Sequence, residues 1–180
     1  MTEPSAVIVA AVVAGFVAFL SLIISKEQTV SNFRQQWIDD LRKDVAEIAA
    51  LVSGIYLEWL AKRGQDQTQL WERVKTDLTG LIELMARVRL RLNPDEKRKT
   101  EGPATRAVLS ALAEIESVFD GGHEFRKLNS FLTRLTEGTQ VILKENGKRV
   151  RSGEPVYKTT KWATFGFALA AFVGWLIWKY

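Results

Sequence analysis

The chain has 180 residues, a formal net charge of +4 and no cysteine. This length fits one folded domain with short additions and excludes an array of several domains. Without cysteine, disulfides, thiolate zinc sites and thiol catalysis are excluded, and with one histidine a metal site would need a cluster of carboxylates that the sequence does not offer. The modest positive charge does not by itself indicate nucleic-acid binding.

Two apolar stretches stand at the ends of the chain. Residues 6–24 contain no charged side chain, and neither do residues 162–178. A helix rises about 1.5 Å per residue and the hydrocarbon core of a bilayer is about 30 Å thick, so each stretch can span a membrane. The first stretch lacks the positive leader of a signal peptide. We therefore expect retained membrane helices at 1–25 and 159–180 around a domain at 26–158.

Basic residues near the spans lie almost entirely on one side. Those that follow the first span are Lys26, Arg34, Arg42 and Lys43, and those that precede the second are Lys144, Lys148, Arg149, Arg151, Lys158 and Lys161. On the other side there is only Lys179. The positive-inside rule then predicts a bacterial inner-membrane protein with both termini outside and the central domain in the cytoplasm. The six residues before the second span form a candidate site for anionic lipid headgroups.

Small residues recur every fourth position in both spans. They are Ala10, Ala14 and Ala18 in the first and Gly166, Ala170 and Gly174 in the second. Such strips let helix backbones approach closely in lipid. They fit the packing of two spans within one chain and equally the assembly of several chains into a homo-oligomer. Neither span has an ionisable residue, so a proton relay or charged ion pathway is not expected.

Between the spans, apolar residues recur at steps of three and four, the spacing of an amphipathic helix. Four series are present: Leu41, Val45, Ile48, Val52, Ile55 and Trp59; Trp71, Val74, Leu78, Leu81, Met85, Val88 and Leu92; Val108, Leu112, Ile115 and Phe119; and Phe125, Leu128, Leu132, Leu135, Thr139 and Ile142. No window alternates with the period of a strand. We predict an all-α fold in which about four helices form an antiparallel cytoplasmic bundle.

The first two bundle helices have recognisable ends. The first is expected over 31–63, after a polar junction at which Thr29 or Ser31 caps a new helix. The second runs from about Asp66 to Leu92.

The third and fourth helices follow a charged loop. Asn93-Pro94 ends the second helix, because proline disfavours a helical residue before it. Residues 95–103 then form a charged surface loop, the third helix begins near Ala104, and the fourth continues to about Ser152.

Catalytic motifs are not evident. The sequence has no phosphate-binding glycine loop, nucleophile elbow or paired-histidine zinc motif, so we expect no enzyme, no cofactor and no small-molecule substrate. Asp39, Asp40 and Asp44 crowd one helical turn and are interpreted as a solvated face. A second basic cluster is a candidate site for a regulatory protein or nucleoprotein complex, or a plain solvated surface. Its members are Arg87, Arg89, Arg91, Lys97, Arg98 and Lys99.

Residues 33–44 read FRQQWIDDLRKD and follow the first span closely. They resemble the FRQxWIxxLRxD stretch of small bacterial two-span membrane proteins with a helical cytoplasmic insert. Some of these resemble the two-transmembrane effectors of phage-defence systems, including retron-type ones. The resemblance implies an effector that a partner complex holds inactive and that damages the inner membrane once released. The alternative is a membrane-anchored interaction module or scaffold whose spans are passive.

Overall fold

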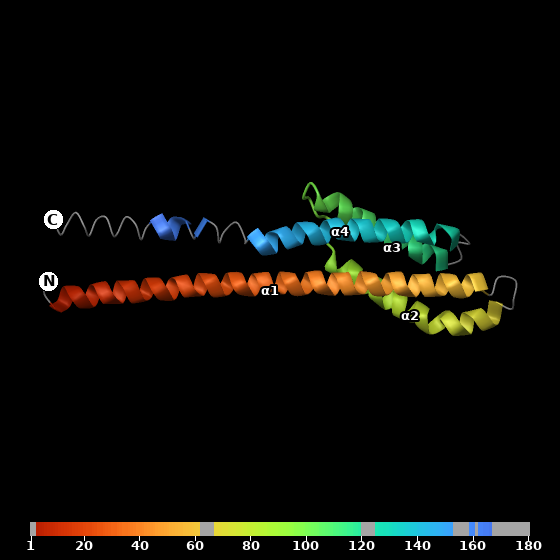
Figure 1. The fold of residues 1–180 in the computed structure, drawn as a ribbon, viewed down its shortest axis with the longest axis horizontal. Coiled ribbons are helices and arrows are strands. Elements are labelled where there is room, and N and C mark those ends of the chain that lie inside the picture. Colours follow the sequence, from red (N-terminus) through yellow and green to blue (C-terminus); the bar gives the residue numbers. More distant parts are fainter. Residues whose placement is uncertain (1–2, 62–66, 120–124, 153–158, 161, 167–180) are drawn as a thin grey trace. The chain divides into compact units, whose positions relative to one another are not determined.

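The computed structural model describes residues 3–61, 67–119, 125–152, 159–160 and 162–166 (Figure 1). These residues contain helices and loops but no strand, which confirms the predicted all-α fold class. The elements are α1 (Glu3–Ala61), α2 (Gln67–Arg91), α3 (Glu101–Phe119), the 3₁₀ turn η1 (Phe125–Lys127) and α4 (Leu128–Ser152). The chain divides into two compact units, one formed by Gln36–Gly147 and the other by Met1–Gln35 with Lys148–Tyr180.

Helix α1 continues through the polar junction where a new helix capped by Thr29 or Ser31 was predicted, so that prediction is wrong. The Thr29 hydroxyl donates a hydrogen bond to the Ser25 carbonyl oxygen at 2.9 Å, within the helix. A hydroxyl bonded one turn back does not cap a new helix. No proline or glycine lies between Gly15 and Gly54, so nothing in the backbone interrupts α1 there.

The ends of the other helices agree with the predicted ends, with one exception. Helix α2 ends just before Asn93-Pro94, and α4 continues to Ser152. Helix α3 begins at Glu101 rather than near Ala104. Pro103 therefore falls in the first turn, where its missing N–H forfeits no intrahelical hydrogen bond. The charged surface loop is correspondingly shorter than expected.

The unit Gln36–Gly147 has a hydrophobic core to which α1, α2, α3 and α4 all contribute. Most of the apolar series read from the sequence are buried in it. Its largest fully buried side chains include Leu41, Ile48, Leu81, Met85, Leu112, Ile115, Leu128 and Leu135. Burial of one such side chain contributes roughly 1.5–3 kcal/mol, so the core is the main source of stability for this helical bundle.

Gly138 lets α4 approach α3 closely within this core. A Cβ atom at Gly138 would lie 2.8 Å from the Val108 Cγ2 atom and 3.1 Å from the Ala104 carbonyl oxygen. Neither separation leaves room for a methyl group without movement of α3. The contact between the two helices therefore depends on glycine.

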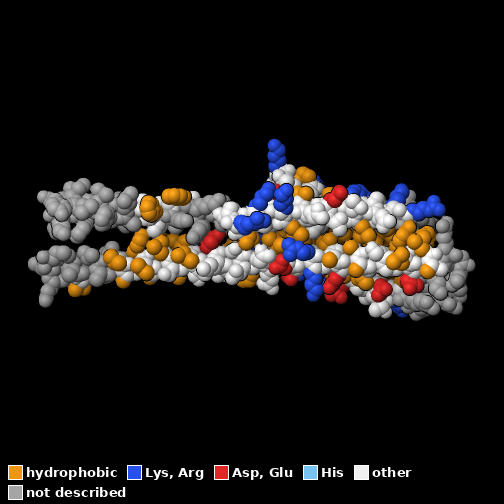
Figure 2. Space-filling view, in the orientation of Figure 1, with side chains coloured by type: hydrophobic (Ala, Val, Ile, Leu, Met, Phe, Trp, Pro, Cys, Tyr) orange, Lys and Arg blue, Asp and Glu red, His pale blue; other side chains and the backbone are white. Residues whose placement is uncertain are grey.

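The other unit contains the first predicted membrane span, which is part of α1. Over Val13–Ala61 this helix is long enough and, with a mean hydropathy of 1.4 in its most apolar window, apolar enough to cross a membrane. No part of that window is buried. Figure 2 shows apolar side chains on the surface of this segment. Large exposed apolar side chains in this part of α1 are Val13, Val17, Phe19, Leu22 and Ile24. A core helix would bury them, so this surface is available to lipid or to another helix.

No second helix of this kind is found among the described residues. Of the second predicted span, residues 162–166 are helical and carry the exposed side chains of Trp162 and Phe165. Residues 167–178 lie outside the described part of the chain, and the second span therefore stays a prediction.

Candidate functional site

Asp44 of α1 is buried and paired with arginines of α2. Asp44 is 2% exposed, and Arg91 Nη1 donates a hydrogen bond to its Oδ2. Arg87 Nη1 lies 3.7 Å from Asp44 Oδ1, and Arg91 Nη2 donates to Asp40 Oδ2 at 3.3 Å. The prediction of a solvated face for Asp39, Asp40 and Asp44 is therefore wrong for Asp44. Its charge tolerates burial because two cations neutralise it.

Arg89 makes a similar link between α2 and α3. Its Nη2 atom donates to Glu116 Oε2 at 2.5 Å. Arg87, Arg89 and Arg91, predicted as partner-binding residues, thus all contact carboxylates of the bundle itself. Their side chains are 46%, 36% and 25% exposed. These three arginines stabilise the packing of α2, and an external partner would compete with the carboxylates for them.

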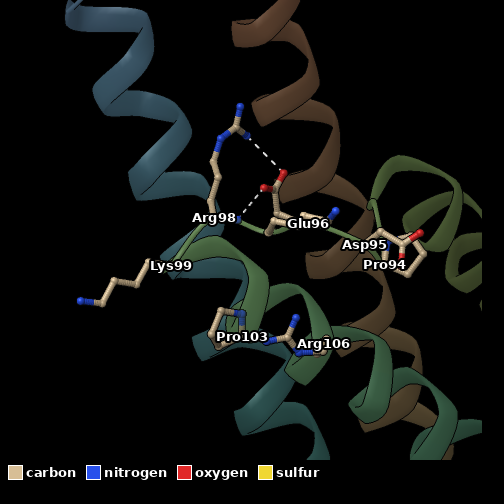
Figure 3. A pocket seen from close by; sticks show the side chains of 8 residues that line it. Pro94, Asp95, Glu96, Arg98, Lys99, Pro103 and Arg106 are labelled. Atoms are coloured by element: carbon tan, nitrogen blue, oxygen red, sulfur yellow. Dashed lines mark hydrogen bonds and ion pairs between the residues drawn. The ribbon is translucent and has the colours of Figure 1, made fainter.

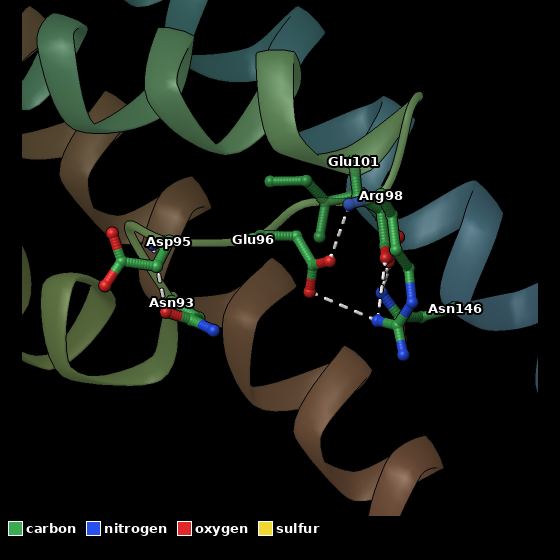
Figure 4. Close-up of polar contacts among 7 residues, drawn as sticks. Asn93, Asp95, Glu96, Arg98, Glu101 and Asn146 are labelled. Carbon is green, nitrogen blue, oxygen red and sulfur yellow. Dashed lines mark hydrogen bonds and ion pairs between the residues drawn. The ribbon is translucent and has the colours of Figure 1, made fainter.

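The remaining members of the basic cluster lie in the loop between α2 and α3. Local hydrogen bonds fold this loop (Figure 4). Asp95 N donates to Asn93 Oδ1 at 3.0 Å, and Arg98 N donates to Glu96 Oε1 at 2.9 Å. Bonds of this kind hold a turn in one conformation.

Gly102 allows the loop to pack closely against the start of α3. Its N–H donates to the Arg98 carbonyl oxygen at 2.8 Å. A Cβ atom at Gly102 would lie only 2.3 Å from the Glu96 carbonyl oxygen. Glycine is therefore required at this position for the observed path of the loop.

A polar network links the loop to α4. Arg98 Nη1 donates to Glu96 Oε2 at 3.2 Å and to Glu101 Oε2 at 3.0 Å. Glu101 is 3% exposed, and its Oε1 accepts a hydrogen bond from Asn146 Nδ2 at 2.5 Å. Asn146 is 9% exposed and also donates to the Ile142 carbonyl oxygen at 3.0 Å. The buried carboxylate is thus shared by a loop cation and an α4 amide, which fixes the position of the loop relative to α4.

A hollow of about 720 Å³ opens over the loop and the first turns of α3 (Figure 3). Its lining residues are Pro94, Asp95, Glu96, Lys97, Arg98, Lys99, Pro103 and Arg106. Lys97, Lys99 and Arg106 are exposed. In the described part of the chain, none of these three side chains forms an ion pair, in contrast to Arg98. Of the predicted partner-binding residues, Lys97 and Lys99 therefore retain the charge most accessible to a partner.

The residues predicted to pack in the membrane are described only in part. Ala14 and Ala18 are exposed in α1, and the side chain of Ala10 lies outside the description. Gly166 is exposed, and apart from its own helix backbone no atom of the described residues lies within 4 Å of the position that its Cβ would take. Ala170 and Gly174 lie outside the described residues.

The residues predicted to bind lipid headgroups lie in and beyond α4. Helix α4 carries Lys144, Lys148, Arg149 and Arg151, whereas Lys158 and Lys161 fall outside the described residues. Lys144, Lys148 and Arg151 are exposed and share one helix face by their spacing of four and three.

No role was predicted from the sequence for Arg106 or Asn146. Glu101 was expected in an exposed loop, whereas the structure buries it. Asn146 follows Ile142 by one turn and so continues the apolar series of the fourth helix, a signal that could have placed it in the core. For Arg106 the sequence offers no comparable signal. It lines the same hollow as Lys97 and Lys99 only because the loop folds against α3.

Among the described residues, no group of His, Asp and Glu side chains is arranged to hold a metal ion. No protein-family model, curated protein or solved structure matches the chain. The chemistry of the residues themselves is therefore the basis for assigning a function.

Proposed function

We propose that this chain is a two-pass inner-membrane effector of a bacterial anti-phage defence system, which permeabilises the membrane when a partner releases its cytoplasmic bundle. The observation that carries the proposal is the apolar segment of α1, whose most apolar window is entirely unburied. A bilayer would cover that surface, and the apolar stretch at 162–178 would supply a return span.

The distribution of basic residues sets the topology of the proposal. With both termini outside, the bundle and the loop between α2 and α3 face the cytoplasm. Lys144, Lys148 and Arg151 then lie near the inner leaflet, where each basic side chain contributes about 1 kcal/mol of attraction to anionic lipid. This attraction would hold the end of α4 at the membrane surface.

Association of spans is the proposed route to membrane damage. Ala14, Ala18 and Gly166 are exposed small residues, which would be covered if spans of several chains packed together. The stretch at 33–44 supports an effector role through its resemblance to two-span proteins of phage defence. In this chain it begins the bundle, since Ile38 and Leu41 are buried.

A membrane-anchored scaffold is the second candidate. The observation that favours it is the exposed cations Lys97, Lys99 and Arg106, which form no ion pair with any residue that the structure describes. Such a surface could bind a partner without any membrane damage. In that case the two spans act only as anchors.

The test is controlled expression of the intact chain in bacteria, with membrane potential and entry of an impermeant dye followed over minutes. The effector proposal predicts rapid depolarisation by the parent and much weaker depolarisation by the Gly166→Leu, Gly174→Leu double variant at matched membrane levels. Leucine side chains would block close approach of the spans. Equal depolarisation by both would contradict association through these glycines, and intact membranes in both would favour the scaffold.

A further inference from the structure

We propose that the hollow over the α2–α3 loop is a docking surface for an acidic segment of a partner protein. This inference rests on the proposed partner-binding role of the bundle and names the chemistry of the partner. Lys97, Lys99 and Arg106 line the hollow, are exposed and have no ion-pair partner in the described part of the chain. Elsewhere in the bundle, arginines such as Arg89 and Arg91 are matched by carboxylates of neighbouring helices.

The surface is held in shape before any partner binds. Arg98 joins the loop to the buried Glu101, which in turn contacts Asn146 of α4. Pro94 and Pro103 restrict the backbone at the two sides of the hollow. A surface fixed in this way loses little conformational entropy when it binds, so a short segment suffices as a ligand.

The lining favours a protein segment over nucleic acid. The hollow contains the carboxylates of Asp95 and Glu96 beside the cations. These would repel a continuous row of phosphates more strongly than a segment whose carboxylates are interrupted by apolar residues. No aromatic side chain is among its lining residues, so bases have no platform on which to stack. The two prolines offer apolar contact to aliphatic side chains. A peptide in which leucines separate pairs of carboxylates matches this mixture.

The test uses the full chain in nanodiscs of zwitterionic phosphatidylcholine, which remove competition from anionic lipid. The probe is a fluorescein-labelled peptide of repeated Glu-Glu-Leu triplets, and binding is followed by fluorescence anisotropy. We expect saturable binding that weakens with added salt. In the Lys97→Glu, Lys99→Glu, Arg106→Glu variant the affinity should fall at least about tenfold, since each exposed pair lost contributes a few-fold and the new carboxylates repel the peptide.

A matched control separates this surface from the overall charge of the protein. It reverses three exposed cations elsewhere and changes the net charge by the same amount: Lys43→Glu, Lys75→Glu and Arg126→Glu. The control should bind the peptide within about twofold of the parent. Circular dichroism melts of both variants establish that each is folded. The peptide affinity of a milder variant, Lys97→Gln, Lys99→Gln, Arg106→Gln, should lie between those of the parent and of the charge-reversed variant.

Three results would overturn the inference. The first is a peptide that does not saturate the parent, and the second is equal weakening by the two triple variants. The third is that the parent binds a labelled oligothymidylate more tightly than the peptide and that the Lys97→Glu, Lys99→Glu, Arg106→Glu variant loses this binding. The hollow would then be a nucleic-acid surface. Peptide binding is measured without any membrane damage. The docking surface and the effector role can therefore fail independently: the first in the anisotropy measurement, the second in the depolarisation and dye-entry measurement.

Discussion

Replacement of Asp44 tests whether a buried ion pair, rather than a solvated carboxylate, joins α1 to α2. The side chain of Asp44 is 3% exposed and contacts both Arg91 and Arg87. Removal of one partner from a fully buried pair costs roughly 3–5 kcal/mol. Because Arg91 and Arg87 are 25% and 46% exposed, water solvates them partly after the change. We therefore expect Asp44→Ala to lower the free energy of unfolding by about 1.5–3 kcal/mol.

The assay is thermal unfolding of the full chain in detergent micelles, followed by circular dichroism at the helix band. For a unit of this size the expected loss corresponds to roughly 5–15 °C in melting temperature. The matched control is Asp39→Ala on the same helix, whose carboxylate is 54% exposed and pairs with the neighbouring Arg42. That change should cost less than about 1 kcal/mol.

Equal melting temperatures of the two variants would show that Asp44 is as solvated as Asp39 and that no buried ion pair joins α1 to α2. A further arm replaces the pair by apolar residues, Asp44→Leu with Arg91→Met. This double variant should recover part of the lost stability, because it removes the buried carboxylate together with its nearest cation. Arg87 and Asp40 each lose a partner, but both side chains are 46% exposed and stay solvated.

Three further predictions concern packing, the polar network and topology. Gly138→Ala should lower the free energy of unfolding by about 1–3 kcal/mol, because the added methyl group overpacks the contact with α3. Gly54→Ala should raise it by about 0.5–1 kcal/mol, because outside its own helix backbone no described atom lies within 4 Å of the added Cβ. Thermal melts should therefore shift in opposite directions for the two variants. Asn146→Ala should cost about 1–2 kcal/mol, because buried Glu101 loses a donor, and protection of the α2–α3 loop from amide hydrogen exchange should fall. A reporter that is active only in the cytoplasm should be active when fused at Lys97, and an inactive but fully expressed fusion would contradict the predicted topology.

The apolar core was predictable because its spacing repeats locally. Leu41, Ile48, Leu81 and Leu112 all come from series read directly from the sequence, and all are buried. The unbroken path of α1 was not predicted, because polar residues such as Thr29 were interpreted as caps although they can also bond within a helix.

The polar contacts were harder to predict because they join distant parts of the chain. Asp44 lies three residues after Leu41, a spacing that places it beside the core, but its burial depends on Arg91 of another helix. Glu101 meets Asn146 only through the alignment of α3 with α4. Local sequence does not contain that alignment, so the charged loop looked fully exposed.

Dye release from sealed liposomes by the purified full chain shows whether the chain itself permeabilises a membrane, since no other protein is present. Vesicles that contain anionic lipid and a self-quenched dye are incubated with the parent and with the Gly166→Leu, Gly174→Leu variant, and flotation measures insertion of each. We expect rapid release by the parent and little by an equally inserted variant. If vesicles stay sealed although the parent protein is fully inserted, the chain is not a membrane-damaging effector and its two spans are anchors.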